Sequence, residues 1–399
     1  RVVDKPLSAG LCAHIDIDSD LKEYFKVNGF VSSIVLKDSK QYYYPQDLSL
    51  DLLTNRDTTT ACLTCGDFDL DAHVKGGYEN LIKEGNSLWR EVSKQMENKY
   101  IDQLLLRKHL PTMSLYLKTG KDNAFCKILK RYGYDLANIF VDMNTSPLAG
   151  INGKILVDSL VMDSIRIDTI RLNFLSDSTQ INYTAQIRNN NKNMYVFNAL
   201  LDGGLHERGA FVNGKIYDEK DRLGIGLGLK ASMEDNGIRL NICNGDPVLG
   251  YKRFHVNDSN YVFLGEDKRV KADVQLVADD GTGVRIYSTD NTDALQDLTV
   301  GINQLELANI TKVIPYLPKI SGKMNGDFHL INTADELSVS SSLGIRNMVY
   351  EGCAMGNIGS EFVYMPKDDG THYVNGNLVC NDREVGMLEG TYNTVNSSI

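Results

Sequence analysis

Two cysteines near the start of the chain have a spacing used in metal and redox chemistry. Cys62-Leu-Thr-Cys65 matches half of a zinc site or a thiol–disulfide pair, both of which place two sulfurs three residues apart. No second CxxC and no paired histidines complete it, and the residues that follow alternate between polar and apolar. A redox motif instead precedes a helix, so we expect neither a metal site nor a redox site here.

A glycine-rich stretch imitates a phosphate loop. In Gly224-Ile-Gly-Leu-Gly228 the isoleucine and leucine keep the alternation of a strand, and no helix start follows to bind an anion. The chain also has no GxSxG elbow, no HExxH and no P-loop. The sequence therefore predicts no catalytic residues, no cofactor and no enzyme.

Bulk composition narrows the class of protein further. The chain has 399 residues, 42% hydrophobic and 24% charged, with a formal net charge of -10. Proteins that bind the nucleic-acid backbone carry a basic stripe, so nucleic acid is disfavoured as a partner. We find no apolar run near the roughly 20 residues of a spanning helix and no secretory signal. Because Arg1 replaces an initiator methionine, we interpret the chain as a processed or excised segment.

The elements that would position a site are mostly strands. Most of the chain alternates apolar and polar residues with period two, and Asn-Gly and Asp-Gly pairs separate the runs as hairpin turns do. Met324, Phe328 and Leu330 lie on one side of the clearest strand, with Asp327 and His329 on the other. We predict a mainly β chain in which each strand has one apolar face.

A helical insert interrupts this pattern. Between residues 76 and 110 apolar residues recur every three or four positions, which is typical of an amphipathic helix. A short strand over 113–117 follows, and then a second helix begins near Asp122 and stops at Gly133. Trp89 lies on the apolar stripe of the first helix, where we expect it to pack against the sheet. The predicted domains are a β segment over 1–75, the helical insert over 76–150 and a long β segment over 151–399.

Residues 300–391 resemble the TamB family of translocation and assembly module proteins, in the AsmA-like group. The resemblance is carried by the segments Pro315-Tyr-Leu-Pro-Lys-Ile-Ser-Gly322, Gly326-Asp-Phe-His-Leu330, Met348-Val-Tyr350, Gly356-Asn-Ile-Gly359 and Gly390-Thr-Tyr392. Two earlier segments, Thr145-Ser-Pro-Leu-Ala-Gly-Ile151 and Asp258-Ser-Asn-Tyr-Val262, are similar to stretches found in these long chains. The richness in asparagine and tyrosine resembles Bacteroidetes members, and the chain resembles a fragment of such a protein.

The resemblance implies an elongated antiparallel β-sheet curled like a taco around a hydrophobic groove. It implies a non-enzymatic protein of outer-membrane biogenesis that lies in the periplasm and is held by an inner-membrane helix missing from this sequence. It further implies two roles: carrying phospholipid between the membranes, and assisting outer-membrane protein assembly with an Omp85-type barrel partner.

The apolar alternation supplies the residues that would line such a groove. The predicted lining consists of Ile181, Tyr183, Ile187, Ile225, Leu227, Val270, Val274, Leu276, Met324, Phe328 and Leu330. Three alternatives stay open from the sequence. The apolar faces could pair into a closed sandwich. The chain could be a secreted or surface adhesin that binds glycans through Tyr42, Tyr43 and Tyr44. It could also be a β-rich polysaccharide-degrading enzyme, marked by clustered carboxylates with raised pKa.

Overall fold

A computed structural model describes residues 8–37, 42–163, 165–267, 269–289, 294, 296–333, 337–367 and 369–393. The protein is mainly β, with 65% strand and 11% helix, which confirms the predicted fold class at this level. The chain divides into two compact units, Arg1–Arg208 (unit 1) and Gly209–Ile399 (unit 2). The predicted domain boundaries at residues 75 and 150 both fall inside unit 1.

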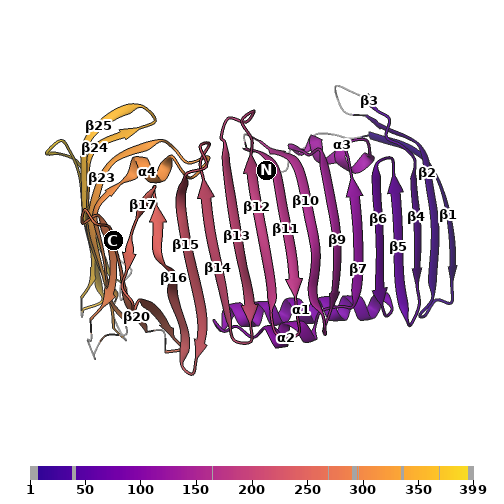
Figure 1. The fold of residues 1–399 in the computed structure, drawn as a ribbon, viewed down its shortest axis with the longest axis horizontal. Helices are drawn as coiled ribbons and strands as arrows, with labels where there is room; N and C mark the ends of the chain where they lie inside the picture. Colours follow the sequence, from indigo (N-terminus) through magenta and orange to yellow (C-terminus); the bar gives the residue numbers. More distant parts are fainter. Residues whose placement is uncertain are drawn as a thin grey trace. The chain divides into compact units, whose positions relative to one another are not determined.

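Unit 1 is an antiparallel meander in which long strands adjacent in sequence are also neighbours in the sheet (Figure 1). The first and last strands of unit 1, β1 and β13, do not pair with each other among the described residues, so the sheet is not closed into a barrel. Its strands are β1 (Ser8–Ser19), β2 (Phe25–Lys37), β3 (Tyr42–Tyr43), β4 (Leu48–Thr54), β5 (Thr58–Cys65), β6 (Phe68–Lys75), β7 (Met113–Thr119), β8 (Tyr134–Asp135), β9 (Asn138–Ser146), β10 (Gly150–Met162), β11 (Ile165–Ser176), β12 (Ile181–Asn189) and β13 (Phe197–His206).

Three helices are inserted between strands of unit 1 and leave the sheet intact. They are α1 (Tyr78–Glu97), α2 (Gln103–Lys108) and α3 (Ala124–Arg131). The helix start predicted at Asp122 is off by one residue: the side chain of Asn123 accepts from Cys126 N–H, and Gly133 follows the helix with a positive φ of 89°. Strands β7 and β9, on either side of α3, pair directly with each other, so the insert contributes two full members of the sheet.

Helices α1 and α2 run across one end of the strands of unit 1 (Figure 1). Tyr78 N–H donates to Thr54 Oγ1 at the end of β4, and Gln103 Nε2 donates to Thr179 O in the turn before β12. Buried Arg107 donates to the carbonyls of Pro147, Leu148 and Asp177, and so ties α2 to two hairpin turns. Side-chain hydrogen bonds to turn carbonyls thus hold α2 in place.

The prediction for Trp89 is wrong. Its side chain is 71% exposed, and Ile82 and Met96, seven residues before and after it, are exposed as well. Because seven residues are close to two helical turns, the three form one apolar stripe that faces away from the sheet. None of the described helices combines the length and apolarity that crossing a bilayer requires.

Unit 2 is also an antiparallel meander, with one added single-residue parallel contact between Val270 and Gln296. Its strands are β14 (Gly209–Tyr217), β15 (Leu223–Glu234), β16 (Gly237–Leu249), β17 (Lys252–Arg253), β18 (His255–Val256), β19 (Tyr261–Gly265), β20 (Val270–Val277), β21 (Gly283–Ser288), β22 (Gln296–Glu306), β23 (Ile320–Asn332), β24 (Leu337–Tyr350), β25 (Cys353–Pro366), β26 (Thr371–Cys380) and β27 (Arg383–Asn393). The short helix α4 (Leu307–Thr311) links β22 to β23.

A small buried core lies in the first half of unit 2. Phe254, in the connection between β17 and β18, is 1% exposed and belongs to a cluster with Val274, Leu276 and Ala278 of the β20 region. Buried Val313, just after α4, comes so close to Gly224 that a side chain at that glycine would collide with it. Connecting segments therefore cover this part of the sheet.

Candidate functional site: the apolar sheet faces

One face of the unit 1 sheet carries apolar side chains in register across nine strands. The residues of this row lie directly opposite one another on successive strands: Leu50, Leu63, Leu70, Leu117, Val141, Ile155, Leu172, Ala185 and Leu201. Because neighbouring strands lie about 4.8 Å apart, eight steps cover roughly 38 Å. We call this set the unit 1 apolar row.

The opposite face of the same strands is polar. One cross-strand row there runs through Asp51, Cys62, Asp71, Tyr116, Asp142, Lys154, Asn173, Thr184 and Asp202. Successive side chains of a strand point to opposite faces, so the sequence alternation places all the charge of this row on one side. The sheet is thus amphipathic as a whole.

Side chains of the unit 1 apolar row are only partly buried. Ala185 is buried, and the other eight members retain part of their exposure. Among the described residues of both units, just seventeen apolar side chains are buried. The core of a closed sandwich would bury most of its inward side chains, so this face differs from such a core.

Three predicted lining residues fall on the apolar face of unit 1. Ile181, Tyr183 and Ile187 alternate with polar residues along β12, on the same side as Ala185. Tyr183 lies opposite Phe174, and Ile187 lies opposite Ile170. The structure therefore brings these three residues together on one surface.

The other eight predicted residues lie in unit 2. Val274, Ile286, Val300 and Phe328 are directly opposite one another across β20–β23, and Leu330 and Met324 flank Phe328 on the same face. Val270 and Leu276 share that face of β20 because they are an even number of residues from Val274. Ile225 pairs with Leu249, which packs against the Phe254 cluster, and Leu227 follows two residues later.

Exposure separates these residues into two groups. Val274 and Leu276 are 5% and 9% exposed because they belong to the Phe254 cluster, whereas Phe328 is 37% exposed. Alternation along a strand cannot show which part of a face a distant connection will cover. Phe254 itself gave no signal in the sequence, since it stands outside the long strands.

The cysteine pair of β5 is split between the two faces. Cys65 is buried on the apolar side, where its thiol lies 3.4 Å from Gln46 O, while Cys62 lies on the polar side beside Asp71. Burial, together with the nearby Asp71 carboxylate, raises the pKa of the Cys62 thiol. Residues three apart in a strand point to opposite faces, so these two sulfurs cannot bind one metal ion. The described residues also contain no group of three or more His, Cys, Asp or Glu side chains placed to hold a metal.

The described carboxyl groups with displaced pKa values have lowered values, whereas a carboxyl group that acts as an acid catalyst has a raised pKa. For Asp218, burial raises the pKa, but hydrogen bonds from Arg222, Lys220 and Tyr251 outweigh it and lower the value to about 2. The Asp177 pKa is also about 2, because the N–H and hydroxyl of Thr179 donate to it. Within the described part of the chain, each carboxyl group with a resolved displacement moves downward.

Two of the three tyrosines considered for glycan binding are exposed, and Tyr43 is partly buried. Tyr42 and Tyr44 are 53% and 73% exposed, at β3 and just beyond it. Lys37 Nζ lies 5.3 Å from the centre of the Tyr42 ring, an arrangement that allows a cation–π contact.

Comparison with known proteins gives no relative: no protein-family model, no curated protein and no solved structure matches the chain.

Proposed function

We propose that the apolar face of unit 1 and the accessible apolar face of unit 2 bind the acyl chains of lipids and let them move across the strands. The observation that carries this proposal is the unit 1 apolar row, a continuous line of aliphatic side chains across nine strands, eight of them partly exposed. Soluble proteins rarely leave a large apolar surface uncovered without a partner for it. An acyl chain fits as that partner because it is apolar, thin and long.

Energetics explain why such a surface would help a lipid leave a bilayer. Exposing a two-chain lipid of about 30 methylenes to water costs on the order of 20 kcal/mol, at roughly 0.8 kcal/mol per CH₂. Contact with the apolar face removes part of that exposure and so lowers the cost. The row is roughly 38 Å long, so an acyl chain can shift along it and keep its apolar contacts.

The resemblance to TamB-like proteins supplies the setting of this proposal. In that setting the chain is a non-enzymatic periplasmic carrier, and its sheet curls into a groove around the lipid. The full-length protein is held at the inner membrane, and an Omp85-type barrel protein is its partner in outer-membrane protein assembly. The cargo is phospholipid, with a nascent outer-membrane protein as the second candidate.

Photo-crosslinking tests the proposal at two adjacent positions. A photoreactive amino acid replaces Leu172, which is on the apolar face, or Asn173, which is exposed on the polar face. After incubation with phospholipid vesicles and irradiation, we expect lipid adducts at 172 and at least about tenfold fewer at 173. Equal yields at both positions, or none at 172, would contradict acyl-chain binding.

A glycan-binding surface protein is the second candidate function, favoured by the exposure of Tyr42 and Tyr44. Aromatic rings on exposed segments can stack on sugar faces. A glycan array separates the two candidates: sugar binding that is lost in Tyr44→Ala, without lipid capture at position 172, selects this second function.

A further inference from the structure

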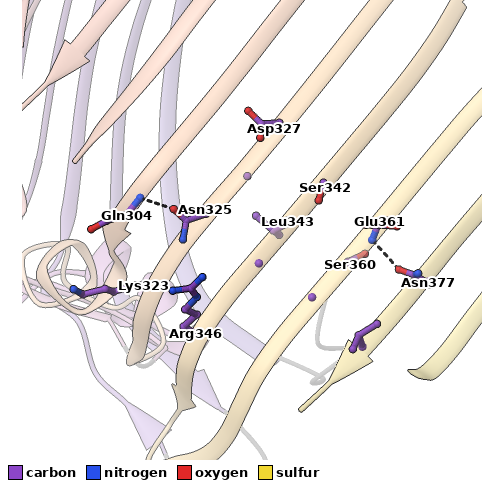
Figure 2. Close-up of a pocket in the computed structure, with 14 residues that line it drawn as sticks. Gln304, Lys323, Asn325, Asp327, Ser342, Leu343, Arg346, Ser360, Glu361 and Asn377 are labelled. Carbon is purple, nitrogen blue, oxygen red and sulfur yellow. Dashed lines mark hydrogen bonds between the residues drawn. The ribbon is translucent and has the colours of Figure 1, made fainter. Parts of the chain in front are cut away.

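The polar face of unit 2 contains a hollow of about 560 Å³ across strands β22–β26 (Figure 2). It lies on the side of β23 opposite Phe328 and Leu330, because Lys323, Asn325 and Asp327 alternate with those apolar residues. The hollow is therefore separate from the apolar face to which we assign lipid.

Glycine creates the floor of this hollow. Gly344 of β24 lies directly opposite Asn325 of β23 and Gly359 of β25, so two adjacent strands lack a side chain at the same level. A Cβ added at Gly344 would meet no atom within 4 Å, and one added at Gly359 would meet its nearest neighbours at 3.9 Å. The space above both glycines is empty of protein.

Unpaired charges lie at the two ends of the floor. Lys323 and Arg346 are directly opposite each other at one end. Asp327 and Glu361 stand at the other end, each opposite Ser342. All four charged residues are exposed, and within the described residues none of them forms an ion pair. Two like charges directly opposite each other destabilise a sheet. Glu306 of β22, directly opposite Lys323 on its other side, offsets part of that cost, and an anion bound at Arg346 would offset the rest.

One amide side chain, that of Asn325, lies between the charged ends, and a second, that of Asn377, lies directly opposite Glu361 at the acidic end. Asn325 Oδ1 accepts from Gln304 N–H at 2.9 Å, and Asn377 Oδ1 accepts from Glu361 N–H at 3.0 Å (Figure 2). With each oxygen occupied, the amino group is the part of these amides that can donate to a ligand. Along β23 the hollow thus offers a cation at Lys323, an amide donor at Asn325 and a carboxylate at Asp327.

We propose that this hollow binds a short peptide with free termini. The C-terminal carboxylate of the peptide binds Lys323 and Arg346. The guanidinium of Arg346 can donate two parallel hydrogen bonds to that carboxylate. A peptide carbonyl accepts from Asn325, and the terminal ammonium binds Asp327 and Glu361. Lys323 and Asp327 are four residues apart, roughly 13 Å along a strand, and an extended peptide of about four residues has that length. No aromatic residue lines the hollow, so it lacks the stacking surface typical of a sugar site.

Calorimetric titration of the full chain with tetraalanine tests this assignment. We expect saturable binding of the peptide with free termini, weakened at least about tenfold by N-acetylation or by C-amidation. Gly344→Trp, whose Cβ would meet no atom within 4 Å, places a large side chain in the hollow and should abolish the binding. Gly390→Trp, at an equally unobstructed glycine of β27, should retain it. Unchanged urea midpoints for both variants show that they fold.

Three results would overturn the proposal: equal affinity for the blocked peptides, unchanged binding by Gly344→Trp, or no heat from tetraalanine at millimolar concentrations. Inorganic phosphate provides a further check. If phosphate binds as tightly as tetraalanine and displaces it fully, the site is a simple anion site and the peptide assignment fails.

Discussion

Leu172 of β11 lies directly opposite Ile155 of β10 and Ala185 of β12, within the unit 1 apolar row. Its neighbour Asn173 is exposed on the other face. One step along the backbone therefore separates the surface assigned to lipid from a water-facing surface. This contrast provides matched variants that differ only in the face they alter.

Leu172→Asp should slow lipid transfer between vesicles by tenfold or more. A lone carboxylate in contact with hydrocarbon costs several kcal/mol, so an acyl chain cannot cross that position easily. Asn173→Asp places the same charge on the polar face and should leave the rate unchanged. Equal rates for both variants in a fluorescent-lipid transfer assay would remove Leu172 from the path.

Phe254→Ala should lower the free energy of unfolding of unit 2 by about 3–5 kcal/mol, because it empties a buried site in the cluster with Val274. Phe328→Ala removes a side chain that is 37% exposed and should cost less than half as much. Urea unfolding monitored by circular dichroism measures both. Similar losses would mean that Phe328 is as well covered as Phe254.

Arg107→Met should destabilise unit 1 by about 2–4 kcal/mol. The buried guanidinium donates to three turn carbonyls, and methionine leaves them without those donors. Arg90→Met on the exposed side of α1 is the control, with an expected change within about 0.5 kcal/mol. If urea midpoints for the two variants agree, the contacts of Arg107 contribute nothing measurable.

Ionised Asp218 should stabilise unit 2 at neutral pH, and this stabilisation should be lost in acid. Its pKa is about 2 in the folded protein against an ordinary value of 3.8, so its contribution is present above pH 3.8 and is lost as the pH falls through 2. We expect Asp218→Asn to cost on the order of 1–2 kcal/mol at pH 7 and almost nothing near pH 2. A urea-unfolding series across that range checks the trend, and a difference that does not change with pH would refute it.

Tryptophan fluorescence reports on the surroundings of Trp89 alone, because Trp89 is the chain's single tryptophan. With 71% of its side chain exposed, it should emit as a solvated indole and be quenched strongly by iodide. Emission of a buried indole, protected from iodide, would restore the sequence-based expectation that Trp89 packs against the sheet.

The sequence predicted strands better than it predicted what covers them. The alternation of Ile181, Tyr183 and Ile187 in β12, and of Met324, Phe328 and Leu330 in β23, correctly placed each set on one face. Alternation is a local property of the backbone, so it survives without knowledge of the fold. The covering of Val274 by Phe254 depends on a connection reaching over the strand, which no local pattern encodes.

Helix α1 shows the same limit. Its apolar periodicity predicted helix correctly but missed the break between Glu97 and Gln103, where α1 ends and α2 begins. The direction of the stripe was wrong, because side-chain hydrogen bonds at Thr54 and Thr179 hold the helices along the strand ends. The polar hollow was also missed. Gly344 and Gly359 are fifteen residues apart, and only the register of β24 and β25 brings them level. Pairs of glycines in successive predicted strands are the signal that could have indicated it.

Native mass spectrometry of the full chain, purified without detergent and then offered phospholipid vesicles, tests the central claim most directly. We predict a population carrying one or more intact phospholipids, which Leu172→Asp reduces and Asn173→Asp does not. A chain that stays free of lipid in every preparation, or binds it equally in both variants, would contradict the account.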